Sequence, residues 1–313
     1  MPHGLDPRTR ARAAGPVLVA LTFVGPACYV GLGDHDPGAA DGAESADDGD
    51  DDGPSRDDGD DDGGEPSCGS AGIGPSTQRR LTRFEYDNSI RDLFGTAVDA
   101  LFVAGSPADG FSVDEKLGRF DANAISPLGT LGLEHYMTAA EAVGAEVAAH
   151  VDAVLPCDPA AIGEDECAHQ FIAAAGRRIY RRPLTDAEQA ALFEVMQAER
   201  TAAAGEADGY GAAIGLVVTA MLQSPYFLYH LEIGEQAVDS AEPVALTQWE
   251  LASRLSFFLW AGPPDDALLD AAAEGRLADP DELAAQAERL VADDRFERTL
   301  VGFHRQWLGI DGG

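Results

Sequence analysis

The segment Leu81-Thr-Arg-Phe-Glu-Tyr-Asp-Asn-Ser-Ile-Arg-Asp-Leu-Phe-Gly95 carries the start, the buried face and the end of one helix. Thr82 and Glu85 have the Thr-x-x-Glu spacing of a capping box, in which each side chain accepts a hydrogen bond from the backbone amide of the other residue. Apolar side chains then recur at helical spacing, at Tyr86, Ile90, Leu93 and Phe94. Gly95 can adopt a conformation that ends a helix. The segment therefore predicts a capped, amphipathic helix.

The same capping pattern occurs twice more, at Thr185 with Glu188 and at Thr247 with Glu250. A leucine precedes the threonine in every copy. Apolar residues follow the third copy at Leu251, Leu255, Phe258 and Leu259. The copies stand at unequal intervals along the chain, so they predict separate helix starts and not the period of a solenoid.

Four further stretches have apolar residues in helical phase: 126–151, 212–222, 279–290 and 296–307. In the first stretch these residues are Leu131, Leu133, Tyr136, Met137, Ala140, Val143, Val147 and Val151. In the last stretch Phe296, Leu300, Phe303 and Trp307 share one face. No strand-like alternation extends beyond a few residues. We therefore expect an all-α fold of one or more helical bundles.

Residues 1–28 have the layout of a lipoprotein-type signal peptide. Three arginines between positions 8 and 12 precede an apolar stretch, 13–27, that is too short to cross the roughly 30 Å hydrocarbon layer of a bilayer. Small residues then lead into Cys28. We expect export, cleavage and acylation of Cys28. Ordinary secretion with cleavage near Ala27, and the absence of export, are the alternatives.

The chain is strongly acidic, with a formal net charge of −34. Residues 34–65 hold fifteen Asp or Glu against Arg56 alone, which gives 1 − 15 = −14. The segment 29–76 has almost no large apolar side chains, so it predicts an extended, disordered acidic linker. This charge argues against sequence-independent nucleic-acid binding and against electrostatic docking on anionic lipids. We expect no nucleic-acid partner, and contact with the membrane only through a lipid anchor.

Cys157 and Cys167 lie close together in the sequence, and in an oxidising compartment we expect them to form a disulfide. A metal site is the alternative, with His169 as the only obvious third ligand. The sequence lacks the Cys-x-x-Cys-His motif of covalent haem, and it lacks H-E-x-x-H, G-x-S-x-G and G-x-x-x-x-G-K motifs. We therefore predict no metal and no cofactor on this chain, and we find no catalytic motif.

Four arginines, Arg177, Arg178, Arg181 and Arg182, cluster around Tyr180. On a continuous helix they would form a cationic ridge. Such a ridge could bind a carboxylate, a sulfated or uronic sugar, or a haem propionate. The alternative is internal pairing with the many acidic side chains. These four residues are our candidate anion- or partner-binding site.

Two other groups of residues also have two interpretations. Glu134, His135 and Glu141 could supply an acid/base pair, or they could lie on a helix surface and at a core edge. The aromatic residues Phe257, Phe258, Trp260 and Trp307 suit core packing, with a ligand groove as the alternative.

Three segments of the chain resemble known families. Residues 79–95, with Gly110-Phe111 and Ile125-Ser-Pro127 downstream, resemble the third planctomycete-specific domain of unknown function. Residues 167–186 resemble the fifth domain of that series, and residues 246–311 resemble the fourth. Proteins of this kind usually continue past the Trp-Leu-Gly segment into two more domains, which we expect this chain to lack.

The resemblance implies an exported helical protein, often linked to c-type cytochrome domains, and it implies no catalytic residue. We expect five parts: a signal peptide (1–28), a linker (29–76) and helical domains at 77–155, 156–235 and 243–313. We further expect an extracytoplasmic, lipid-anchored binding or accessory module, at the periplasm or cell surface, with a cytochrome c-type partner. An extracytoplasmic enzyme acting on an envelope polymer and a structural cell-surface protein are the alternatives.

Overall fold

The three predicted capping boxes are present, and each starts a helix. Before α1 (Arg83–Phe94), the Thr82 amide donates to Glu85 Oε2 at 2.9 Å, and the Glu85 amide donates to the Thr82 hydroxyl at 3.2 Å. Equivalent boxes start α7 (Asp186–Ala202) and α10 (Gln248–Trp260). The predicted helix starts are confirmed.

The computed structural model describes residues 78–124, 127–203, 209–234 and 244–310. The predicted signal peptide with Cys28 and the predicted linker lie outside these residues. The remaining α-helices are α2 (Asp99–Ala104), α3 (Thr130–Ala149), α4 (Val151–Val154), α5 (Pro159–Ile162), α6 (Glu164–Ile179), α8 (Gly209–Leu222), α9 (Pro225–Leu228), α11 (Asp266–Ala273), α12 (Pro280–Val291) and α13 (Arg295–Leu308). Short 3₁₀ turns occur at η1 (Gly95–Val98), η2 (Pro107–Gly110) and η3 (Arg276–Ala278).

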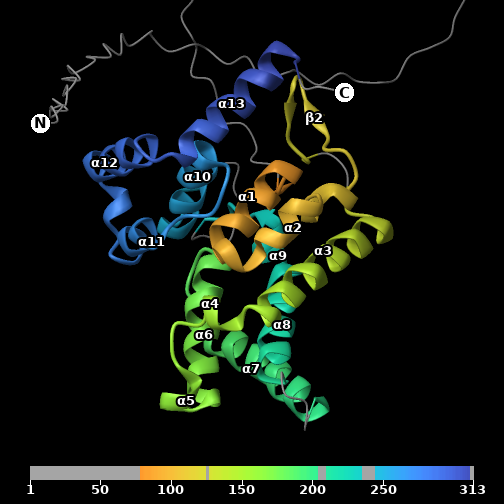
Figure 1. The fold of residues 1–313 in the computed structure, drawn as a ribbon. Coiled ribbons are helices and arrows are strands. Elements are labelled where there is room, and N and C mark those ends of the chain that lie inside the picture. Colours follow the sequence, from red (N-terminus) through yellow and green to blue (C-terminus); the bar gives the residue numbers. More distant parts are fainter. Residues whose placement is uncertain (1–77, 125–126, 204–208, 235–243, 311–313) are drawn as a thin grey trace, which may run out of the picture. The chain divides into compact units, whose positions relative to one another are not determined.

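The strands are two residues long and form two antiparallel pairs. Strand β1 (Arg79–Arg80) pairs with β4 (Tyr229–His230), and β2 (Lys116–Leu117) pairs with β3 (Phe120–Asp121). The rest of the described chain is helix, turn and loop (Figure 1). The prediction of an all-α fold is confirmed.

The larger core is built around the packing of α3 against α8 (Figure 1). Val143 and Ile214 are fully buried between these helices, and side chains of α1, α6 and α7 complete the core. Glycines allow the two backbones to approach closely. A Cβ atom on Gly144 would come within 2.6 Å of the carbonyl oxygen of Gly215. The apolar α8 is therefore a buried central helix.

A smaller core lies within the C-terminal helices α10, α11 and α12. Trp260 is fully buried at its centre, and the indole Nε1 donates to the backbone carbonyl of Leu290 at 2.8 Å. Leu268 and Leu277 pack in the same cluster. Helix α10 also contributes Phe257 to the larger core, so this helix belongs to both cores.

Some predicted apolar faces are not buried. Three residues of the predicted apolar face of α3 are exposed, namely Leu131, Leu133 and Met137. The buried side of this helix is formed by Tyr136, Ala140, Val143 and Val147. On α10 Phe258 is 76% exposed, while Phe257 and Leu259 on either side of it are buried. No residue of α13 is fully buried: Phe296 packs against the smaller core, whereas Leu300, Phe303 and Trp307 of the predicted face are exposed.

The boundaries of the predicted helical domains stay a prediction. The larger core combines side chains from both 77–155 and 156–235, and the smaller core uses residues from 243–313 alone. Residues 77–155 and 156–235 therefore bury their apolar side chains together in one core.

Cys157 and Cys167 form a disulfide, with their Cα atoms 5.7 Å apart, so this prediction is confirmed. The bond closes the loop that contains α5 onto the first turn of α6. Disulfides persist in oxidising compartments, which indicates a non-cytoplasmic location for the protein. Among the helices of the described ranges, none is both long enough and apolar enough to cross a membrane.

Candidate functional site

The four clustered arginines do not form the predicted ridge. Helix α6 ends at Ile179, and Arg181 has a φ of 59°, in the left-handed region. The chain therefore leaves the helix inside the cluster, and only Arg177 and Arg178 lie on α6. The expectation of one continuous ridge was wrong, because it required helical backbone through position 182. Anion binding by these residues stays a prediction.

Arg181 is a buried structural residue. Its side chain donates to the backbone carbonyls of Tyr226, Phe227 and Tyr229 at 2.6, 3.2 and 2.7 Å. The residue is 4% exposed, and burial lowers the pKa of its guanidinium to about 10. Arg181 thus ties the end of α6 to α9 and β4, and both terminal nitrogens of its guanidinium donate within the chain.

Arg182 forms an internal ion pair, as the alternative interpretation predicted. Its two terminal nitrogens donate to the two carboxylate oxygens of Glu188 at 2.9 and 2.7 Å. Its guanidinium carbon lies 4.0 Å from the ring centre of Tyr226. The hydrogen bond from Arg182 has the largest effect on Glu188 and lowers the pKa of that carboxyl to about 2. The pair fixes the turn between α6 and α7.

The other two arginines line a pocket of about 430 Å³, which we call the arginine pocket. Its walls are mostly apolar and come from α1, α4 and α6: Leu93, Phe94, Ala153, Val154, Pro156, Phe171, Ala174, Ala175 and Ile179. The charged residues in its lining are Arg177, Arg178 and Asp266. Its volume lies in the range of about 300–1,000 Å³ that is common for small-molecule sites.

The two arginines of the pocket have weak or incomplete partners. Arg177 pairs with Asp270 at 2.6 Å, but Asp270 is 59% exposed, and such surface pairs contribute little stability. Arg178 Nη2 donates to the backbone carbonyl of Asp92 at 3.1 Å. The Nε of Arg178 is buried and has no hydrogen-bond partner in the described part of the chain. Arg178 therefore keeps donor capacity for a ligand.

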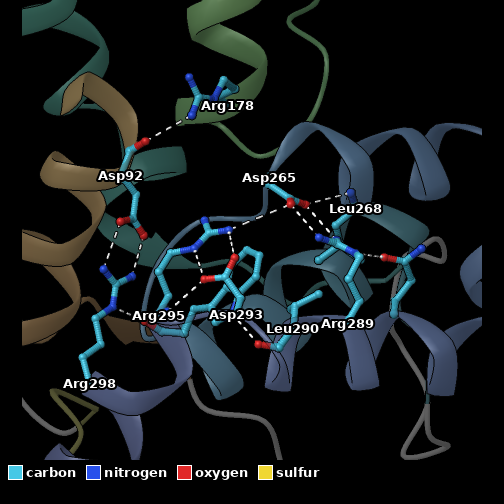
Figure 2. A network of polar contacts seen from close by, with 11 residues as sticks. Asp92, Arg178, Asp265, Leu268, Arg289, Leu290, Asp293, Arg295 and Arg298 are labelled. Atoms are coloured by element: carbon cyan, nitrogen blue, oxygen red, sulfur yellow. Dashed lines mark hydrogen bonds and ion pairs between the residues drawn. The ribbon is translucent and has the colours of Figure 1, made fainter. Parts of the chain in front are cut away.

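Asp92 lies beside Arg178, but its carboxylate is bound by another residue. Arg298 Nη1 and Nη2 donate to its two oxygens at 2.9 and 2.5 Å, and Arg298 Nε donates to the carbonyl of Trp260 at 2.8 Å. Figure 2 shows Arg178 at the backbone of Asp92 and Arg298 at its carboxylate. Among the described residues, no carboxylate forms an ion pair with Arg178.

A further set of charged residues holds α13 against the smaller core (Figure 2). The guanidinium carbon of Arg295 lies 3.4 Å from the ring centre of Trp260, and Arg295 also pairs with Asp293 at 2.8 Å. Arg289 donates to both oxygens of Asp265, the residue that caps α11. Burial is the largest effect and acts to raise the pKa of Asp265, but the hydrogen bonds from Arg289 and the Leu268 amide, together with the charges of Arg289 and Arg295, outweigh it and lower the pKa. This network is structural.

Sequence reasoning missed a buried polar cluster around the capping residue Glu85. Its Oε1 lies 3.4 Å from His230 Nε2 and 3.1 Å from Arg79 Nη1. Burial acts to raise the pKa of Glu85, but His230 and Arg79 outweigh it and hold the pKa well below its usual value. Burial lowers the pKa of His230. Glu85 and His230 are 7% and 6% exposed, so the cluster fixes the entry into α1 and is closed to ligands.

The other candidate residues from the sequence do not come together in one site. His135 and Glu141 line two different pockets, so these two side chains are not brought together, and the acid/base interpretation of Glu134, His135 and Glu141 stays a hypothesis. Phe257 and Trp260 are buried, as core packing predicts, whereas Phe258 and Trp307 are exposed. Within the described ranges, no group of three or more His, Cys, Asp or Glu is placed to hold a metal ion.

Three family models match the chain, each described as a protein of unknown function. They are PSD3 (DUF1587) at residues 79–149, PSD5 (DUF1595) at residues 167–232 and PSD4 (DUF1592) at residues 246–312. No curated protein and no solved structure matches significantly. These are the families that the three segments resemble, in the expected order. The chain therefore contains domains of three families of unknown function, PSD3, PSD5 and PSD4, in succession.

Proposed function

We propose that the chain is an exported binding module that holds an anionic ligand with an apolar body in the arginine pocket. One observation carries the proposal: Arg178 forms no ion pair with a carboxylate of the described chain and has a buried Nε without a partner there. A carboxylate on a hydrocarbon group is the simplest ligand with both required properties.

The energetics favour such a ligand. A donor on a charged group that is left unsatisfied away from water costs about 1–3 kcal/mol or more. A ligand carboxylate can remove this cost by accepting hydrogen bonds from the planar guanidinium, which suits two-point binding. The apolar wall residues supply the second component, at about 25 cal/mol for each Å² of apolar surface buried.

The same proposal covers the location of the protein and its partner: export with a lipid anchor, and a c-type cytochrome. The N-terminal sequence supports export and a lipid anchor at Cys28, which would tether the folded part to a membrane through the acidic segment. The family resemblance supports a c-type cytochrome as the partner. The propionates on an exposed haem edge are carboxylates on an apolar ring, the chemistry that the arginine pocket suits. The net charge of −34 also favours encounter with a basic protein surface.

Calorimetric titration with octanoate and octanamide tests the ligand chemistry, because the two probes share a hydrocarbon chain and differ in charge. We expect octanoate to bind at least about tenfold tighter than octanamide. Arg178→Gln should abolish this preference. Arg254→Gln is the matched control, because Arg254 is 59% exposed and pairs with Glu232 outside the pocket. Equal binding of both probes, or an unchanged preference in Arg178→Gln, would contradict the proposal.

Purification from native membranes tests the partner. The proposal predicts a haem absorption band in the material that copurifies with the wild-type chain, and a weaker band with Arg178→Gln. A colourless preparation would contradict the proposal of a cytochrome partner, but it would not contradict carboxylate binding in the arginine pocket.

A further inference from the structure

Two adjoining pockets lie apart from the arginine pocket, along the start of α3. One measures about 270 Å³ and the other about 580 Å³. Both are lined by Arg80, Asn123, Pro127 and Leu128, so they form one continuous depression, which we call the polar groove. Its lining shares no residue with the arginine pocket.

The groove is preformed by backbone contacts. Asn123 has a φ of 48°, and its carbonyl accepts a hydrogen bond from the Arg80 amide at 3.2 Å. The Asn123 side chain donates to Asp114 at 2.6 Å and accepts from the Glu115 amide at 2.9 Å. A wall that is fixed in this way loses little conformational entropy when a ligand binds.

Apolar side chains make up about half of the larger pocket's lining, and its polar groups are mostly uncharged. Gln78 and Gln223 supply two amide side chains, and Tyr229 adds an aromatic ring with a hydroxyl, while the Asn123 amide is occupied by bonds to Leu81, Asp114 and Glu115. Amide side chains both donate and accept hydrogen bonds, as sugar hydroxyls do. Arg80 is the only charged residue among those that line this pocket.

The smaller pocket combines aromatic rings with polar groups of both signs. The partly buried ring of Phe111 lies with its centre 4.3 Å from that of Tyr136, which is buried in the larger core. Asp114 lies in the same lining as the cation Arg80, so the pocket has no single sign of charge. His135 Nδ1 is buried and has no hydrogen-bond partner within the described residues. A ligand hydroxyl could satisfy it.

From these features we infer that the polar groove binds a neutral oligosaccharide, with one sugar ring or more in each pocket. Aromatic faces pack against the C–H surfaces of sugar rings, and the amides and His135 bind hydroxyl groups. The mixed charge disfavours a strongly anionic ligand here, in contrast to the arginine pocket. This binding activity is separate from the carboxylate binding proposed above and does not depend on it.

Saturation-transfer NMR and calorimetry with uncharged tetrasaccharides test the inference. The probes are cellotetraose, mannotetraose and N-acetylated chitotetraose, with tetragalacturonate as the charged counterpart. We expect at least one uncharged probe to bind with a Kd of about 1 mM or tighter, and tighter than tetragalacturonate. The inference fails if no uncharged probe binds, or if tetragalacturonate binds best.

Variants at the two ends of the groove locate the binding. His135→Leu in the smaller pocket and Gln223→Leu in the larger pocket should each weaken binding of the selected probe at least about fivefold. His150→Leu is the matched control, because His150 caps the far end of α3 and lines neither pocket. Arg178→Gln should also leave sugar binding unchanged, which separates this result from the test of the arginine pocket. Unchanged binding in both His135→Leu and Gln223→Leu would overturn the inference.

Discussion

Breaking the ion pair between Asp92 and Arg298 tests how the C-terminal helices are held to α1. The two side chains are 12% and 23% exposed and share two hydrogen bonds of 2.9 and 2.5 Å. Exposed pairs are worth about 0–1 kcal/mol, whereas removing one partner of a buried pair costs about 3–5 kcal/mol. Because this pair is largely but not fully shielded, we expect Arg298→Met to lower the free energy of unfolding by about 3 kcal/mol.

A double-mutant cycle isolates the interaction between the two residues. Asp92→Leu, Arg298→Met and the double variant are compared with the wild type by urea denaturation followed by circular dichroism. The double variant leaves neither charge without its partner, so its loss should be smaller than the sum of the single losses by about 2 kcal/mol. That difference is the coupling energy.

A surface pair provides the control for this cycle. Arg276 and Glu274 are 40% and 62% exposed, so the same cycle on them should give a smaller coupling energy than the cycle on Asp92 and Arg298. The reasoning is refuted if the coupling between Asp92 and Arg298 is no larger than that of the surface pair. Such a result would mean that burial adds nothing to the contact between α13 and α1.

Three further predictions concern stability. Replacing both Cys157 and Cys167 with Ser should lower the free energy of unfolding by about 3 kcal/mol, as expected for two residues 10 apart in sequence; an unchanged urea midpoint would contradict this. Gly144→Ala should lower the free energy of unfolding by about 1–3 kcal/mol, because the new Cβ would lie 2.1 Å from Thr219 Oγ1. Gly302→Ala is the control and should be neutral or stabilising, because its nearest neighbour would be 3.5 Å away. Two equal losses would refute the close packing of α3 and α8. The pKa of Glu188 is about 2 against an ordinary 4.5, so its contribution is present above pH 4.5 and is lost as the pH falls towards 2. Acid unfolding of Glu188→Gln should therefore be less steep in this window, and an unchanged slope would count against the ion pair.

The helix starts could be predicted from the sequence because a capping box is a local device. Thr82 and Glu85 lie within one turn, and the hydrogen bonds between them depend on little beyond that turn. The disulfide could be predicted for a similar reason, since Cys157 and Cys167 bracket a short loop. The apolar face of α1 was also correct, because Tyr86 and Ile90 are fully buried.

The candidate site depends on contacts between distant parts of the chain. The carboxylate of Asp92 pairs with Arg298 and not with Arg178, and Asp92 and Arg298 are 206 positions apart. No local sequence motif predicts an ion pair between residues so far apart. The positive φ of Arg181, which ends the expected ridge, is set by its bonds to three backbone carbonyls of α9 and β4. Periodicity alone also could not show that Phe258, Phe303 and Trp307 stay exposed, since that depends on which neighbours pack against them.

Binding of a ligand carboxylate by Arg178 is measured most directly at its Nε–H group. In ¹⁵N-labelled protein, the Nε resonances of Arg178 and Arg254 are assigned from the two Gln variants and followed during titration with octanoate. We expect a saturable shift of the Arg178 resonance with octanoate, none with octanamide, and a stationary Arg254 resonance. An Arg178 resonance that does not move at saturating octanoate, or moves equally with octanamide, would contradict carboxylate binding by Arg178.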